Sequence, residues 1–226
     1  MINISNRLKK VAQFVLDDSK SNALIDVGCD HALLDIYLLQ NNKDLSIIAS
    51  DINEGPLSKA KENISKYSLL NKINLCLCDG ISLIDDKIDT IVISGMGKDT
   101  IVDILVNDKE KLKNVSKLVI SSNNKFPELR KEICNLGFVI EDEEIIYEEE
   151  KYYIVMKFIK GNINYSDKEL YFGPELLHKK DSLFYKYFSY LKNEKEYVLS
   201  KLSERCLDKK KKLELEIEKI TTELTV

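Results

Sequence analysis

The chain has 226 residues and a formal net charge of −4, and 44% of its residues are hydrophobic, as is ordinary for a globular protein. It has no apolar run of about 18 residues, so we expect no membrane span. Residues 1–7 lack the apolar core of a signal peptide. The five cysteines form no CxxC pair and have no histidine at zinc spacing, which favours reduced thiols, a cytoplasmic location and no bound metal.

The net charge argues weakly against a nucleic-acid partner, but the charge is unevenly distributed. Residues 161–226 carry 13 basic and 12 acidic side chains, whereas residues 1–160 carry 21 and 26. Contact with RNA would therefore depend on local basic patches. One candidate is the run from Lys209 to Lys212, although such a run is more often simply a solvated helix face.

Strand-like and helix-like segments alternate through the first two thirds of the chain. A first helix is expected between Leu8 and Leu16, with Ser5 as its cap. The segments expected to be strands are 23–28, 45–51, 73–78, 88–94, 117–122, 138–147 and 151–159. The segments expected to be helices are 32–42, 54–69, 98–106 and 127–136.

Only residues 148–150 separate the last two expected strands, so they form a hairpin and not a β-α-β crossover. The sequence therefore predicts an α/β fold with a seven-stranded, Rossmann-like sheet that is parallel except for a final antiparallel hairpin. Such a sheet is typical of class I S-adenosylmethionine-dependent methyltransferases, although a fold alone does not establish a function.

The pattern changes after Gly161, where apolar residues begin to step alternately by four and three. One such seam consists of Phe184, Phe188, Leu191, Lys195, Val198 and Leu202, and the other of Leu213, Ile217, Ile220 and Leu224. Heptad seams on two successive helices predict an antiparallel, coiled-coil-like hairpin that turns between Arg205 and Asp208. We therefore expect a methyltransferase domain at 1–160 and a helical arm at 161–226.

Acidic residues and glycines follow the first three strands, where such sheets bind their ligands. Gly28 ends the first strand beside Asp26 and Asp30, and Asp51 lies 23 residues after Gly28, close to the spacing of a ribose-binding acid. The alternatives are that Gly28 only makes a tight turn and that Asp51 caps the next helix, although Asn53 lies nearer the cap position. Asp79-Gly80 can accept a hydrogen bond from an adenine amino group, or form an ordinary turn.

The fourth strand ends in Ser94-Gly95-Met96-Gly97, nearest the expected point of methyl transfer. Glycines there leave room for a planar base, although a flexible loop is the alternative. The chain lacks the Asn/Asp-Pro-Pro-aromatic motif common in enzymes that methylate exocyclic amines, which argues against attack by N6 of adenine. His31, beside Asp30, is a candidate general base, but a lone histidine at a helix start is often structural.

Together these residues resemble the bacterial tRNA (adenine-22-N1)-methyltransferase family over nearly the whole chain. The matching motifs are Arg7-Leu8, Gly28-Cys29-Asp30-His31-Ala32, Gly55-Pro56, Asp79-Gly80, Gly95-Met96-Gly97, Asn123, Leu129-Arg130 and Phe172-Gly173-Pro174. The chain departs from the family at Asp51, where Glu is common, at Lys98, where the family has a second glycine, and at Ser121-Ser122, where it has Gln-Pro. The last two departures put the shape of the base pocket in doubt, but not the fold or the cofactor.

The resemblance implies S-adenosylmethionine as cofactor and tRNA as partner, with the helical arm at 161–226 as a candidate tRNA-binding element. The residues it implies for cofactor binding are Asp26, Gly28, Cys29, Asp30, His31, Asp51, Ile52, Asp79, Gly80 and Ser94. Those it implies for catalysis are Asp30, His31, Gly95, Met96 and Asn123. Two other functions stay open: methylation of another RNA position or a small molecule, and RNA binding without turnover. The sequence predicts neither the oligomeric state nor the preferred tRNA.

Overall fold

The computed structural model describes residues 2–17, 22–203 and 205–225. The chain divides into two compact units, Met1–Leu177 and His178–Val226. Within the described residues, no helix combines the length and the apolarity needed to cross a membrane.

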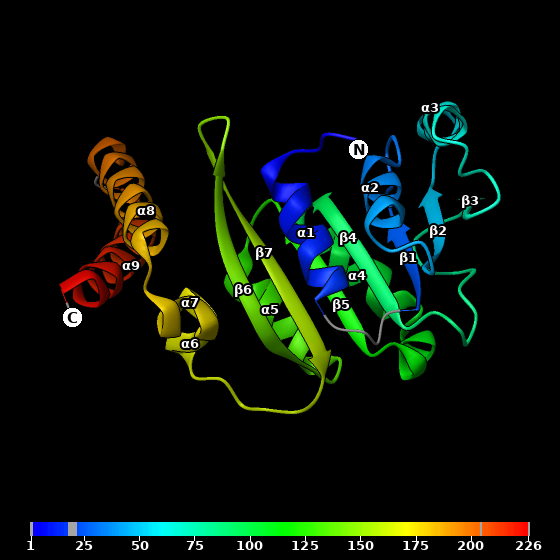
Figure 1. The fold of residues 1–226 in the computed structure, drawn as a ribbon. Coiled ribbons are helices and arrows are strands. Elements are labelled where there is room, and N and C mark those ends of the chain that lie inside the picture. Colours follow the sequence, from blue (N-terminus) through cyan, green and yellow to red (C-terminus); the bar gives the residue numbers. More distant parts are fainter. Residues whose placement is uncertain (1, 18–21, 204, 226) are drawn as a thin grey trace. The chain divides into compact units, whose positions relative to one another are not determined.

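The first unit is built on a seven-stranded sheet in the order β3-β2-β1-β4-β5-β7-β6 (Figure 1). The strands are β1 (Ala23–Val27), β2 (Ser46–Asp51), β3 (Ile73–Leu77), β4 (Thr90–Met96), β5 (Lys117–Ser122), β6 (Phe138–Glu148) and β7 (Lys151–Lys160). The first five strands are parallel to one another, and β7 is antiparallel to both β5 and β6. The predicted sheet with its terminal hairpin is therefore confirmed, with strand ends that differ from prediction by at most two residues.

Helices cover both faces of this sheet, because the parallel crossovers, except the one from β3 to β4, carry helices across it. They are α1 (Asn6–Leu16), α2 (Leu33–Asn41), α3 (Glu54–Lys66), α4 (Lys98–Asn107) and α5 (Phe126–Asn135), with a 3₁₀ helix at Lys109–Asn114. The first three lie on one face and α4 and α5 on the other (Figure 1). The Ser5 hydroxyl caps α1 by accepting from the Leu8 N–H, as predicted.

The functional edge of the sheet is set by its strand order. The chain leaves β1 in one direction to build β2 and β3, and later returns to the other side of β1 to build β4 and β5. The carboxyl ends of β1 and β4 thus lie side by side, with Val27 paired to Ile93. Open α/β sheets bind their ligands at such a switch in strand order.

Two short helices, α6 (Asp167–Phe172) and α7 (Pro174–Lys179), follow the sheet and carry the first unit past the domain boundary expected at residue 160. The buried Arg130 guanidinium explains why α6 stays with this unit. It pairs with Glu143 at 2.5 Å and donates to the Leu170 and Tyr171 carbonyl oxygens at 2.9 and 3.3 Å. These bonds tie the end of α6 to α5 and β6.

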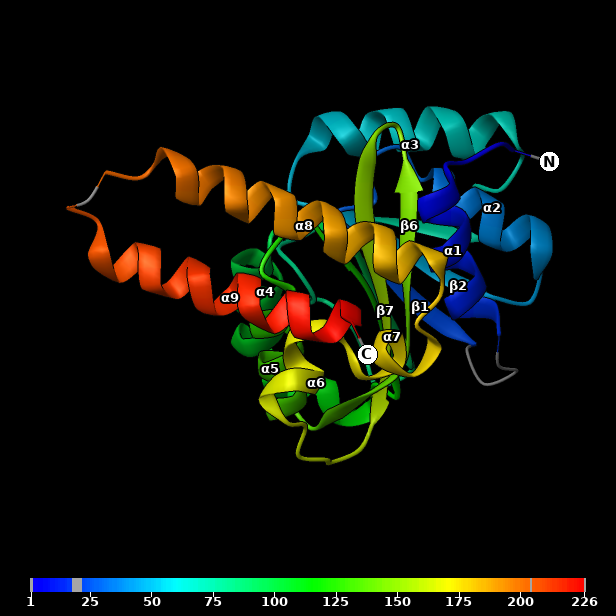
Figure 2. The same cartoon turned by 90° about the vertical axis from the view of Figure 1, so that its left-hand side faces the viewer.

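The second unit contains a helical hairpin, as the seams predicted. It consists of α8 (Ser182–Lys201) and α9 (Leu207–Thr225), which run antiparallel side by side (Figure 2). Phe184, Phe188 and Ile220 are buried, whereas Val198 is 38% exposed, so the predicted seam buries its apolar residues mainly at one end. Lys195, a charged member of that seam, pairs with Glu216 of α9 at 2.5 Å.

Candidate active site

A cavity of about 550 Å³ opens at the carboxyl edge of the sheet, between the ends of β1, β2, β3 and β4. Every residue expected to bind the cofactor lines it, and so do Gly95 and Met96. Asn123 lies outside the lining, next to it. The lining residues that the sequence did not single out as functional are Arg7, Leu8, Val27, Leu33, Leu34, Ser50, Asn53, Cys78, Thr100 and Ile104.

The turn between β1 and α2 forms one wall of the cavity and has an unusual backbone. Gly28 has φ +74°, and Asp30 and Ala32 also have positive φ values of 50° and 55°. The N–H groups of Gly28 and Cys29 both donate to the Ser50 carbonyl oxygen at 2.9 Å, which fixes the turn against β2. Gly28 is therefore more than a link between strand and helix, because it brings bare backbone to the cavity surface.

Two carboxylates follow β2 and β3 at the same edge. Asp51 lines the cavity, and its Oδ1 accepts from the Asn53 N–H at 2.9 Å. The helix α3 begins at Glu54 with Asn53 in the cap position, so Asp51 is not the helix cap. Asp79 lines the cavity beside Gly80, which has φ +56° and forms a turn closed by the Ser82 N–H.

A third carboxyl group, that of Asp26, lies at the floor of the cavity and is almost completely buried. Burial, reinforced by the nearby charge of Asp51, raises the pKa of Asp26 to about 7. The buried Asp35 of α2 lies near it, and burial followed by the charge of Asp26 raises the Asp35 pKa as well. A cationic ligand in the cavity would favour the ionised form of Asp26.

The neighbouring thiol of Cys29 is not set up as a nucleophile. Burial, together with the charges of Asp26, Asp35 and Asp51, raises its pKa well above the ordinary range. Cys29 therefore contributes a neutral side chain to the cavity, while its backbone N–H is used to fix the turn against β2.

The end of β4 forms the opposite wall, and its backbone is irregular there. The pairing of β4 with β5 shifts between Ser94 and Met96, and Gly95 within this bulge has φ +88°. Bulges of this kind often re-aim the chain next to active sites. Asn123, at the end of β5, is bonded to both bulge residues: its backbone N–H donates to the Met96 oxygen at 3.0 Å, and its Nδ2 donates to the Gly95 oxygen at 2.6 Å.

His31 lines the cavity, with its Nε2 3.5 Å from Asp30 Oδ1. Its backbone oxygen accepts from the Asn63 side chain of α3 at 3.1 Å, so the residue also holds the turn in place. The structure thus brings together the histidine and carboxylate of the base hypothesis, and it also gives this residue a structural contact.

Arg7 is a cavity residue that the sequence indicated only as part of a family motif. Its Nη1 donates to the Ser94 hydroxyl at 2.8 Å, and its guanidinium lies 5.2 Å from the centre of the Tyr153 ring. Glu148 accepts from the backbone N–H groups of Asn6 and Arg7 at 2.7 and 3.3 Å. The start of α1 is therefore joined to the tip of the β6–β7 hairpin, which places a cation beside the end of β4.

The described residues contain no group of three or more His, Cys, Asp or Glu side chains arranged to hold a metal ion. The cavity instead offers carboxylates, glycine backbone and apolar side chains. Carboxylates can accept hydrogen bonds from hydroxyl and amino groups and attract cations. This chemistry suits a nucleoside that carries a positive charge.

Comparisons with known proteins agree with this chemistry. The sequence model of the TrmK family, described as tRNA (adenine(22)-N(1))-methyltransferase, matches residues 24–222. The chain belongs to this family. A Bacillus subtilis relative named tRNA (adenine(22)-N(1))-methyltransferase is 29% identical over 192 residues, which cover 82% of this chain and 79% of the relative.

Solved structures extend the likeness to the whole chain. TrmK of M. capricolum, solved with S-adenosyl-homocysteine, is 31% identical with a TM-score of 0.86, and the match covers 98% of each chain. A Streptococcus pneumoniae protein solved with S-adenosyl-L-methionine is also 31% identical, with a TM-score of 0.88, and the match covers 98% of this chain and all of that one.

Proposed function

We propose that this protein methylates N1 of adenine 22 in tRNA, with S-adenosylmethionine as the methyl donor. The observation that carries the proposal is the cavity itself. In a member of this family, it gathers four carboxylates and three glycines of positive φ at the carboxyl ends of β1, β2, β3 and β4. A cytoplasmic location, where tRNA is processed, is part of the proposal.

The cavity residues fit the cofactor group by group. Asp51 is placed to accept hydrogen bonds from ribose hydroxyls, and Asp79 to accept one from the adenine amino group. Ile52 lines the cavity with its side chain 63% exposed, and so offers an apolar surface to the adenine ring. Gly28 exposes backbone for the close approach of the amino-acid portion, and Asp26 balances its positive charge.

S-adenosylmethionine supplies an electrophilic methyl group on a sulfonium. The adenine N1 has an in-plane lone pair at neutral pH, so the protein does not need to remove a proton to create the nucleophile. The residues around Gly95, Met96 and Asn123 then contribute chiefly by holding the base in position for attack. In this account His31 and Asp30 shape the cofactor turn, and neither has to act as a base.

The tRNA must present N1, which lies on the pairing edge of adenine, so the base has to leave its stack before reaction. We assign the binding of the rest of the tRNA to the helical arm that contains α8 and α9. Lys209 and Lys212 of α9 are exposed, and neither has a resolved ion-pair partner among the described residues. Lysines of this kind can bind backbone phosphates.

Transfer of a labelled methyl group from S-adenosylmethionine to unmodified tRNA tests the proposal. We expect transfer to tRNA and none to a double-stranded RNA of equal length. Cofactor binding without any transfer would instead favour an RNA-binding protein that lacks turnover. Transfer to nucleotides other than 22 would favour a methyltransferase of different specificity.

A further inference from the structure

The side-chain amide of Asn123 has a fixed orientation at the edge of the active site. One end of the amide lies 2.6 Å from the Gly95 carbonyl oxygen, which can only accept a hydrogen bond. The end that faces this oxygen must therefore be the NH₂ group, and the carbonyl oxygen Oδ1 must point away from it. Asn123 is exposed, and no described residue donates a hydrogen bond to Oδ1.

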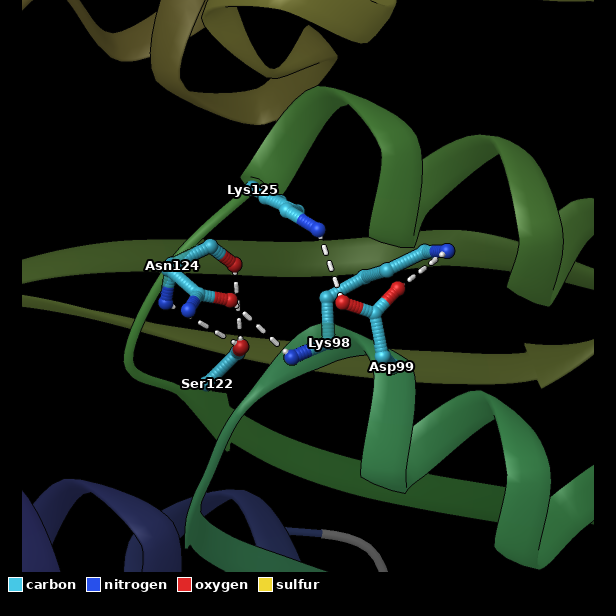
Figure 3. A network of polar contacts seen from close by, with 5 residues as sticks. All are labelled: Lys98, Asp99, Ser122, Asn124 and Lys125. Atoms are coloured by element: carbon cyan, nitrogen blue, oxygen red, sulfur yellow. Dashed lines mark hydrogen bonds and ion pairs between the residues drawn. The ribbon is translucent and has the colours of Figure 1, made fainter.

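The turn that carries Asn123 is held from both sides (Figure 3). The Ser122 hydroxyl bonds to the backbone of Asn124, and the Asn124 side-chain oxygen accepts from the Lys98 N–H at 3.1 Å. Asp99 then bridges the starts of α4 and α5, with the Lys125 ammonium at 2.7 Å and the Lys98 ammonium at 3.1 Å. Lys125 itself has a positive φ of 50°, as a tight turn requires.

Ser122 holds this turn through its hydroxyl group, whereas Lys98 holds it through its backbone N–H, which any residue at that position would offer. The β4–α4 and β5–α5 turns are thereby joined into one wall. On that wall, Asn123 is bonded to Gly95 and Met96, beside which the base is methylated in the proposed function, and its Oδ1 remains able to accept a hydrogen bond.

We propose that Asn123 Oδ1 is the acceptor for the 6-amino group of the target adenine, and that it selects adenine over guanine. The inference rests on the proposed function. A base whose N1 lies next to Gly95 and Met96 places its 6-substituent next to N1, within reach of the same wall. An acceptor there pairs with the amino group of adenine and repels the O6 of guanine.

The same bond strengthens during the reaction. The N1 lone pair forms the new bond to the methyl carbon as the carbon–sulfur bond breaks, and the positive charge passes from the sulfonium to the purine ring. The 6-amino group therefore becomes a better donor in the transition state than in the bound substrate. Asn123 Oδ1 would then stabilise the transition state more than the ground state, which raises the rate and not only the affinity.

The test pairs a change in the protein with a change in the RNA. A ligated tRNA carries either adenosine or purine riboside, which lacks the 6-amino group, at position 22. For the wild-type protein, the loss of the hydrogen bond alone should lower kcat/KM about 10- to 150-fold with purine riboside, as expected for a bond with charge on one partner, and kcat should carry part of the fall. Because the amino group also makes N1 more nucleophilic, part of any fall is chemical.

The variant Asn123→Ala isolates the hydrogen bond. The lower nucleophilicity of N1 in purine riboside affects this variant and the wild type equally, but the variant has no acceptor for the 6-amino group. Its preference for adenosine over purine riboside should be at least about 10-fold smaller than that of the wild type. The matched control is Asn114→Ala, an exposed amide near the opposite end of β5 whose side chain bonds to Asp86. This control should keep the wild-type preference, and both variants should bind S-adenosylmethionine normally.

Two failures can be told apart. If the wild-type protein does not methylate N1 of adenosine 22, the proposed function is wrong. If it does so, but Asn123→Ala shows the same preference as the wild type, the role of Asn123 is wrong and the proposed function stands. The wild-type comparison of the two tRNAs does not depend on any variant folding.

Discussion

Gly28 and Met96 meet across the candidate active site so closely that a Cβ atom built on Gly28 would overlap the terminal methyl group of Met96. Gly28 belongs to the turn after β1, and Met96 to the end of β4. The two walls of the cavity therefore touch at this point, and a larger residue at position 28 would require the flexible Met96 side chain to move. The positive φ of Gly28 adds a second reason for glycine at this position, since other residues are strained there.

We expect Gly28→Ala to weaken S-adenosylmethionine binding by about tenfold, because the positive φ of this position costs a residue with a Cβ atom about 1–2 kcal/mol and Met96 must move aside. Calorimetric titration measures the dissociation constant. The control is Gly55→Ala in α3, where a Cβ would meet nothing within 4 Å. Equal affinity in the two variants, both folded, would show that the backbone conformation of Gly28 does not shape the cofactor site.

Asp51→Ala should weaken cofactor binding by about 10- to 150-fold, because hydrogen bonds to a charged acceptor contribute about 1.5–3 kcal/mol. Asp44→Ala, which removes an exposed carboxylate near the start of β2, is the matched control and should leave the affinity unchanged. An Asp51→Ala protein that folds and binds as the wild type does would refute the ribose assignment.

The high pKa of Asp26, about 7, makes cofactor binding depend on pH. Without ligand, Asp26 is mostly protonated at pH 6, and its contribution to folding stability is lost as the pH rises through 7. The cationic cofactor favours the carboxylate, so binding at pH 6 should release close to one proton, and affinity should rise between about pH 5.5 and 7.

Calorimetry at pH 6 in two buffers of different ionisation enthalpy measures this proton release. The groups that interact with Asp26 are Asp51 and the buried Asp35, so the variant Asp26→Asn tests which carboxyl is responsible. Asp26→Asn should abolish most of the proton release. A wild-type protein that exchanges no protons on binding would contradict the role of Asp26.

The arm should bind tRNA through phosphates. We expect the double variant Lys209→Ala, Lys212→Ala to bind tRNA more weakly, with a salt dependence reduced by about one unit of slope for each phosphate that the variant no longer binds. The matched control is Lys109→Ala, Lys113→Ala, two exposed lysines before β5. If the two double variants show the same affinity and slope as the wild type, the arm does not bind phosphates through these lysines.

Much of the cavity could be predicted because its chemistry follows the strands. Gly28, Asp51 and Asp79 each lie within two residues of the carboxyl end of a strand, and parallel strands bring these ends to a single edge, so the order of strands and helices in the sequence places them together. The heptad spacing likewise predicted the hairpin of α8 and α9, since each seam is local to one helix.

Arg7 and the fixed orientation of Asn123 could not be predicted in the same way. Arg7 reaches the cavity because α1 packs beside a hairpin tip more than 140 residues away in the chain, at Glu148 and Tyr153. The orientation of Asn123 depends on a bulge in β4. The apolar spacing does not predict helix α6, because this helix is only six residues long. Its start is nevertheless signalled by Ser166 and Glu169, which form a capping box.

The central claim is tested most directly by the identity and position of the methylated nucleoside. After reaction with an unmodified tRNA transcript, the account predicts 1-methyladenosine at position 22, detected as a stop in reverse transcription and by its chromatographic separation from N6-methyladenosine. A transcript with guanosine at position 22 should remain unmodified. N6-methyladenosine, or a stop at another position with adenine 22 unchanged, would contradict both the account of the base pocket and the proposed function.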